Sequence, residues 1–374
     1  MRIAYVTETW HPAINGVVTR LSATVSDLAG RGHEVLVVAP GAFDQPLEGV
    51  RVRGVRSVRI PFIYGGEPWG LPLPSVVRLL DDFGPDLIHA VNPVLLGWSG
   101  IAYARRRGIP LACSYHTQVA RYAGFYHLGF AEPFIWAVIR LAHRLADLNL
   151  VTSQASAIEL GRRGVGRIRL WRRGIDERHF GVRDPDPVMR ARLSDGHPER
   201  ALVLYVGRLA AEKGLERLRP LTRSAGLHLA LVGEGPARAA VAATLGGAHG
   251  TFVGPLRGDE LAAAYASADV LAFPSITDTV GLALLEALAS GLPVVASRTV
   301  AAQELLAGAP AAELVPSEDG AQWLKAVTRL ASHAPPRSVI AEDACRRCGT
   351  WGEVTDDLLW LYDGARRVRR RAAA

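Results

Sequence analysis

The chain has 374 residues, of which 49% are hydrophobic and 21% charged, so we expect a globular protein of two domains. No apolar run reaches the about 18–20 residues that a membrane-spanning helix needs. The net charge of +7 and the isoelectric point near 9.6 leave nucleic acid and an anionic membrane open as partners, although no zinc finger or RNA-recognition aromatic pair accompanies the charge.

The first half of the chain alternates short β-rich runs with helical stretches. Residues 17–33 have helical periodicity and end at Gly30 and Gly32. This alternation predicts an α/β domain with a parallel, doubly wound sheet over residues 1–175. Its strands are predicted at residues 2–8, 33–41, 85–92, 109–116 and 147–153.

A stretch rich in Pro, Asp and Arg near 173–190 is interpreted as a linker, after which the alternation resumes. It predicts a second doubly wound domain over 176–349, and a helix from 350 with an Arg-rich tail to 374 is expected to pack back on the first domain. Ligands of such sheets bind beyond the carboxyl ends of the strands, so we predict a site in a central cleft between the two halves. The strands of the second half are predicted at residues 201–209, 227–235, 249–256, 269–275 and 292–298.

The stretch SITDTVGLALLEALASGLPVVAS, at residues 275–297, carries the clearest chemical signal. Gly281 opens a predicted helix that stops at Gly291, and its free amides and positive dipole end suit a phosphate. Glu286 could accept two hydrogen bonds from a vicinal diol such as that of ribose, and Asp278 could meet hydroxyls beyond the phosphate. The alternative is a helix-capping acid followed by a partly exposed helical glutamate.

Three further positions follow predicted strands. Arg208 and Lys213 in VGRLAAEKG could converge on a diphosphate, unless this is only a solvated basic loop. Asn15 and Gly16 could turn backbone amides toward a phosphate, or could form a plain strand–helix turn. His116 stands at a strand end, which favours a functional role over a purely structural one.

Other motifs are weaker. Cys345 and Cys348 have CxxC spacing, but no second pair or nearby histidine completes a zinc site, so no metal is expected. Asp184 and Asp186 lie in the predicted linker, between prolines, rather than at a strand end. The GEGPAR stretch at 233–238 begins like a dinucleotide fingerprint but lacks its third glycine and its distal acid.

With these residues in view, the chain resembles the retaining glycosyltransferases of family 4, which have the two-domain GT-B fold. The resemblance covers nearly the whole chain. Within the family it is most similar to GDP-mannose-dependent α-mannosyltransferases that act on glycolipids. The segments that carry it, in family order, are Asn-Gly-Val after the first strand, PDLIHAVNP, SYHTQ, LWRRGID, VGRLAAEKG, LVGEGP and DTVGLALLEALASGLPVV, together with YHLGFAEPFIW and the final aromatic helix.

The resemblance implies roles for the candidate residues. Arg208 and Lys213 would bind the donor diphosphate, and Glu286 the ribose. Asp278 takes the place of the first glutamate in the family's paired-glutamate motif, and Val280 stands where phenylalanine is usual, which leaves the donor sugar open. His116 would lie beside the transferred sugar.

The resemblance likewise implies that Asn15 and Gly16 lie against the phosphate or the acceptor. The expected reaction is transfer of a hexosyl group, best mannose from GDP-mannose, to a hydroxyl of a lipid-linked or glycan acceptor with retention, without a metal or cofactor.

Three other readings remain open. The chain could use a UDP-sugar and a soluble acceptor such as an aminocyclitol, it could be a GT-B nucleotide-sugar 2-epimerase, or its charge could serve nucleic-acid binding. The last has no aromatic stacking motif in support, and no nucleic acid is expected.

The expected location is the cytoplasm, because the cysteines are few and odd in number and the start MRIAYVTETW has no apolar core. Residues 1–175 carry 20 Lys and Arg against 12 Asp and Glu, clustered at 51–59 and 104–108. We therefore expect weak, peripheral attachment of this half to the anionic inner face of the membrane.

Overall fold

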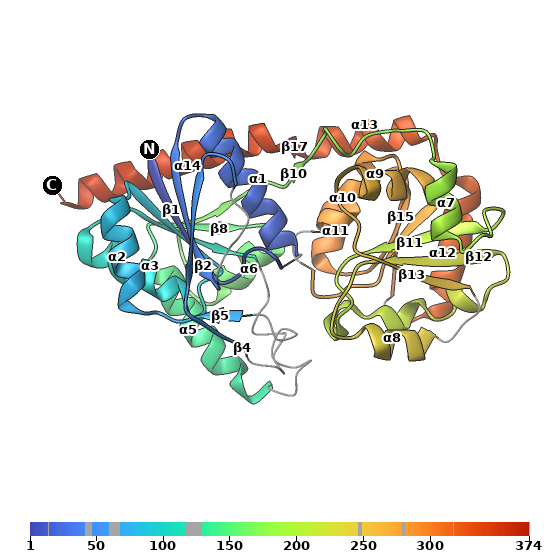
Figure 1. Cartoon of the computed structure of the whole chain (residues 1–374), viewed down its shortest axis with the longest axis horizontal. Coiled ribbons are helices and arrows are strands. Elements are labelled where there is room, and N and C mark those ends of the chain that lie inside the picture. The colour runs from blue at the N-terminus through green and yellow to red at the C-terminus, as the bar shows by residue number, and fades with distance from the viewer. Residues whose placement is uncertain are drawn as a thin grey trace. The chain divides into compact units, whose positions relative to one another are not determined.

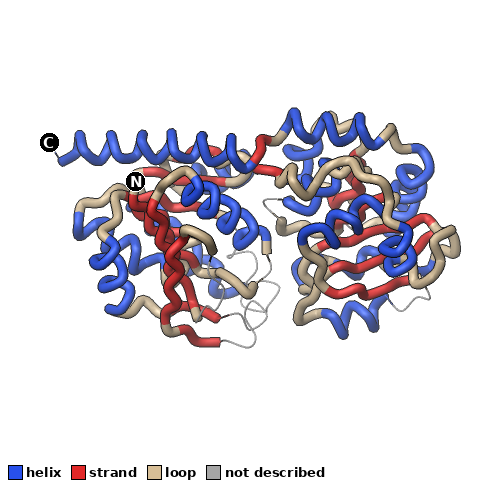
Figure 2. The backbone as a smooth tube through the Cα atoms, turned by 45° about the horizontal axis from the view of Figure 1, so that its top comes forward, coloured by secondary structure: helices blue, strands red, loops and turns tan. Residues whose placement is uncertain are grey.

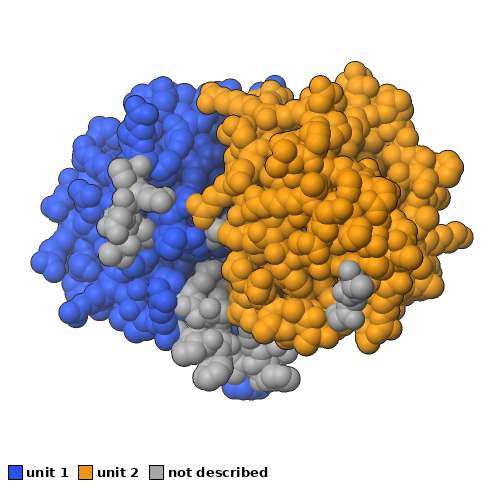
Figure 3. All heavy atoms as spheres, turned by 45° about the vertical axis from the view of Figure 1, so that its right-hand side comes forward, with its two compact units in different colours: residues 1–174, 351–374 blue, residues 175–350 orange. Residues whose placement is uncertain are grey.

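The structure is a computed structural model, and it describes residues 1–13, 15–41, 47–59, 68–116, 129–245, 249–278, 281–316 and 318–373, with side chains up to residue 370. The chain forms two compact units, coloured separately in Figure 3. The first unit contains Met1–Gly174 and Trp351–Ala374, and the second contains Ile175–Thr350.

The first unit is built on a seven-stranded sheet in the order β3-β2-β1-β6-β7-β8-β9, with every neighbouring pair parallel. Buried apolar residues make up most of its central strands, as expected for a parallel sheet covered on both faces. A short antiparallel pair, β4–β5, stands apart. The strands are β1 (Arg2–Thr7), β2 (Glu34–Pro40), β3 (Val50–Val55), β4 (Ser57–Arg59), β5 (Pro68–Gly70), β6 (Leu87–Val91), β7 (Leu111–Tyr115), β8 (Leu148–Val151) and β9 (Ile168–Leu170).

Helices cover both faces of this sheet, as Figures 1 and 2 show. Alternate residues of β1 divide between the two faces: Tyr5 packs with α1 and α14, whereas Val6 packs with α2 and α3. The helix α14 runs along the first unit to the C-terminal end of the chain. The helices are α1 (Gly16–Gly30), α2 (Pro74–Phe83), α3 (Gly97–Arg107), the 3-10 turn η2 (Gly129–Ala131), α5 (Glu132–Leu145), α6 (Gln154–Arg162) and α14 (Trp351–Ala373).

The second unit has a six-stranded sheet in the order β13-β12-β11-β14-β15-β16. This is the Rossmann order 3-2-1-4-5-6. One of its cores joins the sheet to α8 and α12, with Trp323 fully buried. The strands are β11 (Ala201–Val206), β12 (Leu227–Val232), β13 (Gly250–Gly254), β14 (Val270–Phe273), β15 (Val294–Ser297) and β16 (Ala312–Val315).

Short helices connect these strands, and α10 packs on α13. They are α7 (Pro187–Leu193), α8 (Arg238–Leu245), α9 (Gly258–Ser267), α10 (Leu282–Ala289), α11 (Val300–Leu306), α12 (Gly320–His333), α13 (Arg337–Arg347) and the 3-10 turns η3 (Ala211–Lys213), η4 (Leu215–Leu218) and η5 (Leu221–Arg223). Where the chain passes between the units, β10 (Gly174–Ile175) and β17 (Gly349–Thr350) form a two-stranded sheet.

The predicted pair of doubly wound α/β units is confirmed, but one local prediction is wrong. The predicted linker at 173–190 is partly structured: α7 begins inside it and buries Met189, because Asp186 caps the helix by accepting hydrogen bonds from the amides of Val188 and Met189. The helix predicted from residue 350 is α14, which continues through the Arg-rich end to Ala373. Among the helices that the structure describes, none is both long and apolar enough to cross a membrane.

Candidate active site

The sheet order of the second unit identifies where a ligand would bind. From β11 the chain moves outward to β12 and β13, and then returns to β14 on the other side of β11. The loops after β11 and β14 therefore separate at their carboxyl ends, which is the switch point where ligands of such sheets bind. Arg208 and Lys213 follow β11, and Asp278 and Gly281 follow β14.

The side chains at this switch point contact one another. Lys213 Nζ donates to Asp278 Oδ2 at 2.8 Å, and Asp278 Oδ1 accepts from the backbone amide of Gly281 at 2.9 Å. Arg208 forms an ion pair with Glu212, whose backbone carbonyl accepts from the Thr277 hydroxyl at 3.1 Å. The structure thus brings together four sequence-predicted residues, two cations among them, at one edge of one sheet.

Gly281 is the N-cap of α10 and has φ +66°, in the left-handed region that glycine adopts without strain. A Cβ at this position would also come within 3.0 Å of Leu305. The predicted helix start and the stop before Gly291, where φ is +72°, are both confirmed. The amide end of α10 consequently lies beside Asp278 and Lys213, so a phosphate there would meet both a cation and free N–H groups.

Gly233 and Gly235, from the rejected dinucleotide motif, serve the packing of this site. A Cβ on Gly233 would lie 2.0 Å from the carbonyl oxygen of Gly207, and a Cβ on Gly235 would lie 2.3 Å from that of Leu209. The backbone amide of Leu209 donates to the carbonyl of Glu234 at 3.0 Å. Glycine is therefore required for the loop after β12 to lie directly against the loop that carries Arg208.

Glu286 lies on α10, partly buried, and its Oε2 accepts from the hydroxyl of the fully buried Tyr265 at 2.9 Å. Burial raises the pKa of the Glu286 carboxyl to about 7; the Tyr265 hydrogen bond opposes this shift and the charge of Asp176 adds to it. Phe180 packs edge-on against Tyr265 at 5.7 Å between ring centroids. Near neutral pH the carboxyl can therefore either accept or donate a hydrogen bond.

In the first unit, Asn15 caps α1. Its Oδ1 accepts from the amides of Val17 at 3.1 Å and Val18 at 3.0 Å, and its Nδ2 donates to the Thr9 hydroxyl at 3.2 Å. The side chain of Asn15 thus has a structural role, and Gly16 begins the helix. The loop that ends in these residues follows β1, at the switch point between β1 and β6.

His116 is buried, with 3% of its surface exposed, and its Nε2 shares a hydrogen bond of 2.8 Å with the Ser114 hydroxyl. Its ring packs edge-on against Trp171, 5.3 Å between centroids. Burial holds the pKa of His116 well below its usual value, and the charge of Arg20 lowers it further. The imidazole is therefore neutral and suited to hydrogen bonding, not to ionic contact.

Glu8, directly after β1, was not predicted as a functional residue. Its carboxylate accepts four backbone hydrogen bonds of 2.8–3.1 Å from the amides of residues 94–97, at the start of α3. Burial raises the pKa of this carboxyl despite those bonds. Glu8 fixes the loop after β6 to the loop after β1, where Asn15 and Gly16 lie.

Sequence reasoning also missed two partners. Glu212, fully buried at its side chain, could have been recognised from its i,i+4 spacing to Arg208. Tyr265 gave no such signal, because it lies on a different helix from Glu286. Val280, where the family usually has phenylalanine, lies outside the described residues.

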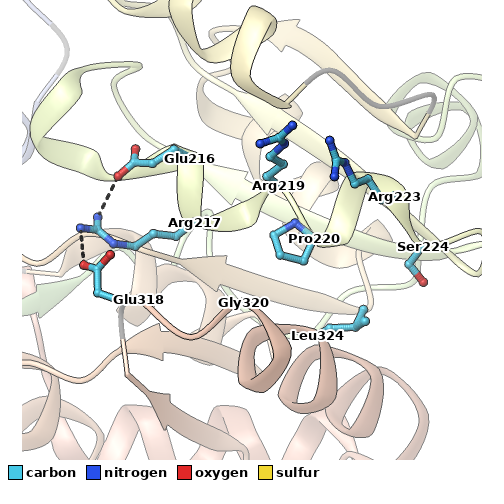
Figure 4. Close-up of a pocket in the computed structure, with 9 residues that line it drawn as sticks. All are labelled: Glu216, Arg217, Arg219, Pro220, Arg223, Ser224, Glu318, Gly320 and Leu324. Carbon is cyan, nitrogen blue, oxygen red and sulfur yellow. Dashed lines mark hydrogen bonds and ion pairs between the residues drawn. The ribbon is translucent and has the colours of Figure 1, made fainter.

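A separate pocket of about 600 Å³ lies elsewhere on the second unit, against the start of α12 (Figure 4). Arg217 there pairs with Glu216 and Glu318, at 3.5 and 3.1 Å. None of the expected donor-binding residues lines it. Its lining residues are Glu216, Arg217, Arg219, Pro220, Arg223, Ser224, Glu318, Gly320 and Leu324.

Comparison with known proteins places this arrangement in a family. Residues 14–179 match the family model "Glycosyltransferase Family 4", and residues 200–333 match "Glycosyl transferases group 1". A GDP-mannose-dependent alpha-mannosyltransferase of Mycobacterium tuberculosis is 35% identical over 381 residues, covering 100% of this chain and 99% of that protein. The sulfoquinovosyl transferase SQD2 of Arabidopsis thaliana is 38% identical over 291 residues, 76% of this chain and 57% of that protein.

Among solved structures, a sucrose-phosphate synthase from Thermosynechococcus elongatus superposes with a TM-score of 0.81 at 22% identity, with 100% of both chains covered. At that identity the likeness concerns the fold, which is GT-B. The full-length likeness to the mannosyltransferase, together with the two family models, shows that the chain belongs to glycosyltransferase family 4.

Proposed function

We propose that the chain transfers a mannosyl group from GDP-mannose to a hydroxyl of a glycolipid or glycan acceptor, with retention of anomeric configuration and without a metal. The observation that carries the proposal is the cluster of Arg208, Lys213, Asp278 and the amide of Gly281 at one switch point. The mannosyl donor is favoured by the full-length relative named for GDP-mannose.

The chemistry follows from the charges at that switch point. In the transfer, the bond between the sugar C1 and the phosphate oxygen breaks and its electron pair stays on the diphosphate. Arg208, Lys213 and the amide end of α10 would stabilise that growing negative charge, and stabilisation of this kind usually contributes more than any other effect to the rate. Glu286, from α10, would accept from the ribose hydroxyls.

Retention requires that the acceptor oxygen attack the sugar C1 from the same face that the diphosphate leaves. The acceptor oxygen forms the new bond to C1, and its proton passes to the departing phosphate oxygen, so that GDP and the glycoside result. No nucleophile from the protein is needed for this balance. Asp278 and the neutral His116 would bind hydroxyls of the transferred sugar.

A second candidate is a family 4 enzyme that uses another nucleotide sugar. The likeness over 291 residues to a protein named as a sulfoquinovosyl transferase favours it, since that name gives a sugar other than mannose. The two candidates share the diphosphate and ribose contacts and differ at the sugar.

The deciding experiment is calorimetric binding of GDP-mannose, UDP-glucose and UDP-N-acetylglucosamine, followed by product analysis with a lipid extract as acceptor, with and without EDTA. We expect GDP-mannose to bind tightest and activity to survive EDTA. Preference for a UDP-sugar would favour the second candidate, and GDP release without any glycoside would favour an epimerase.

Variants of the sugar-side residues give a finer test. Asp278→Ala and His116→Gln should both lower the rate of transfer without a matching loss of GDP affinity. Removal of Asp278 also releases Lys213 and the Gly281 amide for the diphosphate. An equal loss of GDP affinity would contradict their placement at the sugar.

A further inference from the structure

A fully buried arginine lies in the first unit. Arg20, on α1, has no exposed surface, and its Nη2 donates to the backbone carbonyl of Trp171 at 2.7 Å and to that of Arg172. Within the described part of the chain, its Nε and Nη1 have no hydrogen-bond partner and no carboxylate pairs with it. Burying such a cation is costly, and burial lowers the pKa of Arg20 to about 9.

The cation is coupled to His116 by an aromatic ring. The guanidinium of Arg20 stacks over Trp171, 4.1 Å from the ring centroid. Trp171 is itself buried, and it packs edge-on against His116 at 5.3 Å. Trp171 therefore holds one side of the imidazole, in addition to the hydrogen bond that the ring shares with the Ser114 hydroxyl.

The ionisable groups around His116 come from three elements. Arg20 projects from α1, His89 from β6 and His143 from α5, and a positive charge on any of them lowers the pKa of His116. Burial lowers the pKa of His89 to about 3 and that of His143 to about 4, so both are neutral at physiological pH. Arg20, with its pKa near 9, is the member of this group that remains charged.

We infer that Arg20 is a positioning residue for His116: through Trp171 it fixes the orientation of the imidazole, and it adds a positive charge to the buried surroundings of the ring. The inference rests on the proposed function only in the role of His116 at the transferred sugar. It explains why an uncompensated cation is retained in the core, where an apolar side chain of similar size would pack at less cost.

Two substitutions separate the effect of the Arg20 charge from the effect of its planar, hydrogen-bonded guanidinium. Arg20→Met removes the charge and both hydrogen bonds to the 171–172 carbonyls, whereas Arg20→Lys retains the charge and loses the planar fork. Arg163→Met is a matched control, since Arg163 also stacks on a tryptophan of the first unit, 3.7 Å from the Trp136 ring, and is not among the charges that lower the pKa of His116.

The measurements are the titration of ¹⁵N-labelled histidines, with His116 assigned through His116→Gln, and the pH profile of kcat/KM. In Arg20→Met, His116 should titrate at a higher pH than in wild type, and the acid limb of kcat/KM should move with it. In Arg20→Lys, the titration should stay as in wild type while kcat falls at least tenfold, because the ring is less well held. Arg163→Met should match wild type.

An unchanged His116 titration in Arg20→Met would overturn the inference. If Arg20→Met does not fold, Arg20→Lys decides, and wild-type kcat in that variant would overturn it. The histidine titration needs no substrate. Absence of mannosyl transfer would therefore refute the proposed function, while the titration would still test the role of Arg20.

Discussion

At the residue scale, the cations of the proposed diphosphate site are already engaged. Arg208 pairs with Glu212, whose side chain has no exposed surface, and Lys213 pairs with Asp278, whose side chain is 24% exposed. A donor diphosphate would have to share or replace these contacts. The two cations should therefore differ in what their removal does to stability, although both should weaken nucleotide binding.

Lys213→Ala and Arg208→Ala should each weaken GDP binding by about 10- to 100-fold, since each removes one charge-assisted contact of about 1.5–3 kcal/mol. Arg208→Ala should also lower the free energy of unfolding by about 3–5 kcal/mol, because it leaves the buried Glu212 carboxylate without the arginine. Calorimetry and urea unfolding measure the two effects.

The double variant Arg208→Met with Glu212→Leu is the control for this prediction. It should regain much of the lost stability and none of the GDP affinity. Recovery of GDP affinity together with stability would show that Arg208 acts only on folding.

Glu286 should make donor binding depend on pH. Its pKa lies near 7, so the carboxylate that accepts from ribose is mostly absent at pH 6 and mostly present at pH 8. GDP-mannose should bind about tenfold more tightly at pH 8 than at pH 6. The intact sugar nucleotide is the probe, because its diphosphate does not titrate in this range, and Glu286→Gln should show weak binding at both pH values.

The Glu286 carboxyl should make folding stability depend on pH in the opposite direction to donor binding. A carboxyl whose pKa is raised from 4.5 to about 7 holds its proton more tightly when folded, so its contribution is present below pH 4.5 and is lost as pH rises through 7. Relative to Glu286→Gln, wild type should lose about 2.5 kcal/mol of unfolding free energy between pH 5 and pH 8. A constant difference between the two proteins would mean that Glu286 is solvated.

The sequence allowed prediction of the residues that follow strands, because strand ends can be located from apolar runs. Arg208, Lys213, Asp278 and Gly281 were found in this way. Contacts between distant segments could not be found: Tyr265 reaches Glu286 from another helix, and Arg20 reaches the carbonyls of residues 171 and 172 across about 150 positions. Such pairs depend on tertiary packing, which local sequence periodicity does not reveal.

At the scale of elements, the strands with long apolar runs were predicted within two or three residues. In the two large sheets β3, β9 and β16 were missed. β3 lies at a sheet edge with alternating arginines, β9 has only three residues, and β16 is a half-buried edge strand of four residues. The Gly233–Gly235 turn was noticed for the wrong reason. Its glycines allow the loop after β12 to lie against the loop after β11. Local sequence patterns do not predict that contact.

Gly235→Ala should disturb the Arg208 loop without a change at Arg208 itself. The new Cβ would lie 2.3 Å from a backbone oxygen of Leu209, so the two loops must separate. We expect a loss of about 1–3 kcal/mol in unfolding free energy and weaker GDP binding, measured by urea unfolding and calorimetry. Gly226→Ala is the matched control, because a Cβ there has nothing within 4 Å; equal behaviour of the two variants would show that the loop contact is unimportant.

At the scale of the whole molecule, the two doubly wound sheets could be predicted because alternating strands and helices admit few other arrangements. The role of α14 was only partly foreseen. Its residues Val354, Leu358 and Tyr362 are fully buried in the first unit, and the Tyr362 hydroxyl bonds Tyr5 at 2.9 Å and His89 at 2.6 Å. The last helix of the chain thus completes the core of the first unit.

The charge of the molecule is concentrated on that first unit, where residues 1–175 contain 20 Lys and Arg against 12 Asp and Glu. Arg51, Arg53, Arg56 and Arg59 are all exposed, although Arg51 pairs with Glu34 at 3.5 Å. On the same unit, Phe130 on the turn η2 and Phe134 in the first turn of α5 are 83% and 72% exposed. Exposed aromatic residues on a basic unit are typical of a surface that contacts lipid headgroups.

We therefore predict weak, salt-sensitive binding to anionic vesicles, measured by sedimentation. Each well-placed arginine contributes about 1 kcal/mol near such a surface, and exposed charges are screened within about 8 Å at physiological ionic strength. Replacing Arg53, Arg56 and Arg59 by serine should abolish sedimentation, and Phe134→Ser should weaken it. Arg219→Ser with Arg223→Ser, which removes two exposed arginines from the second unit, should leave it unchanged. If wild type stays in the supernatant at low salt, the acceptor is not reached by membrane attachment of this kind, and a soluble acceptor becomes the better hypothesis.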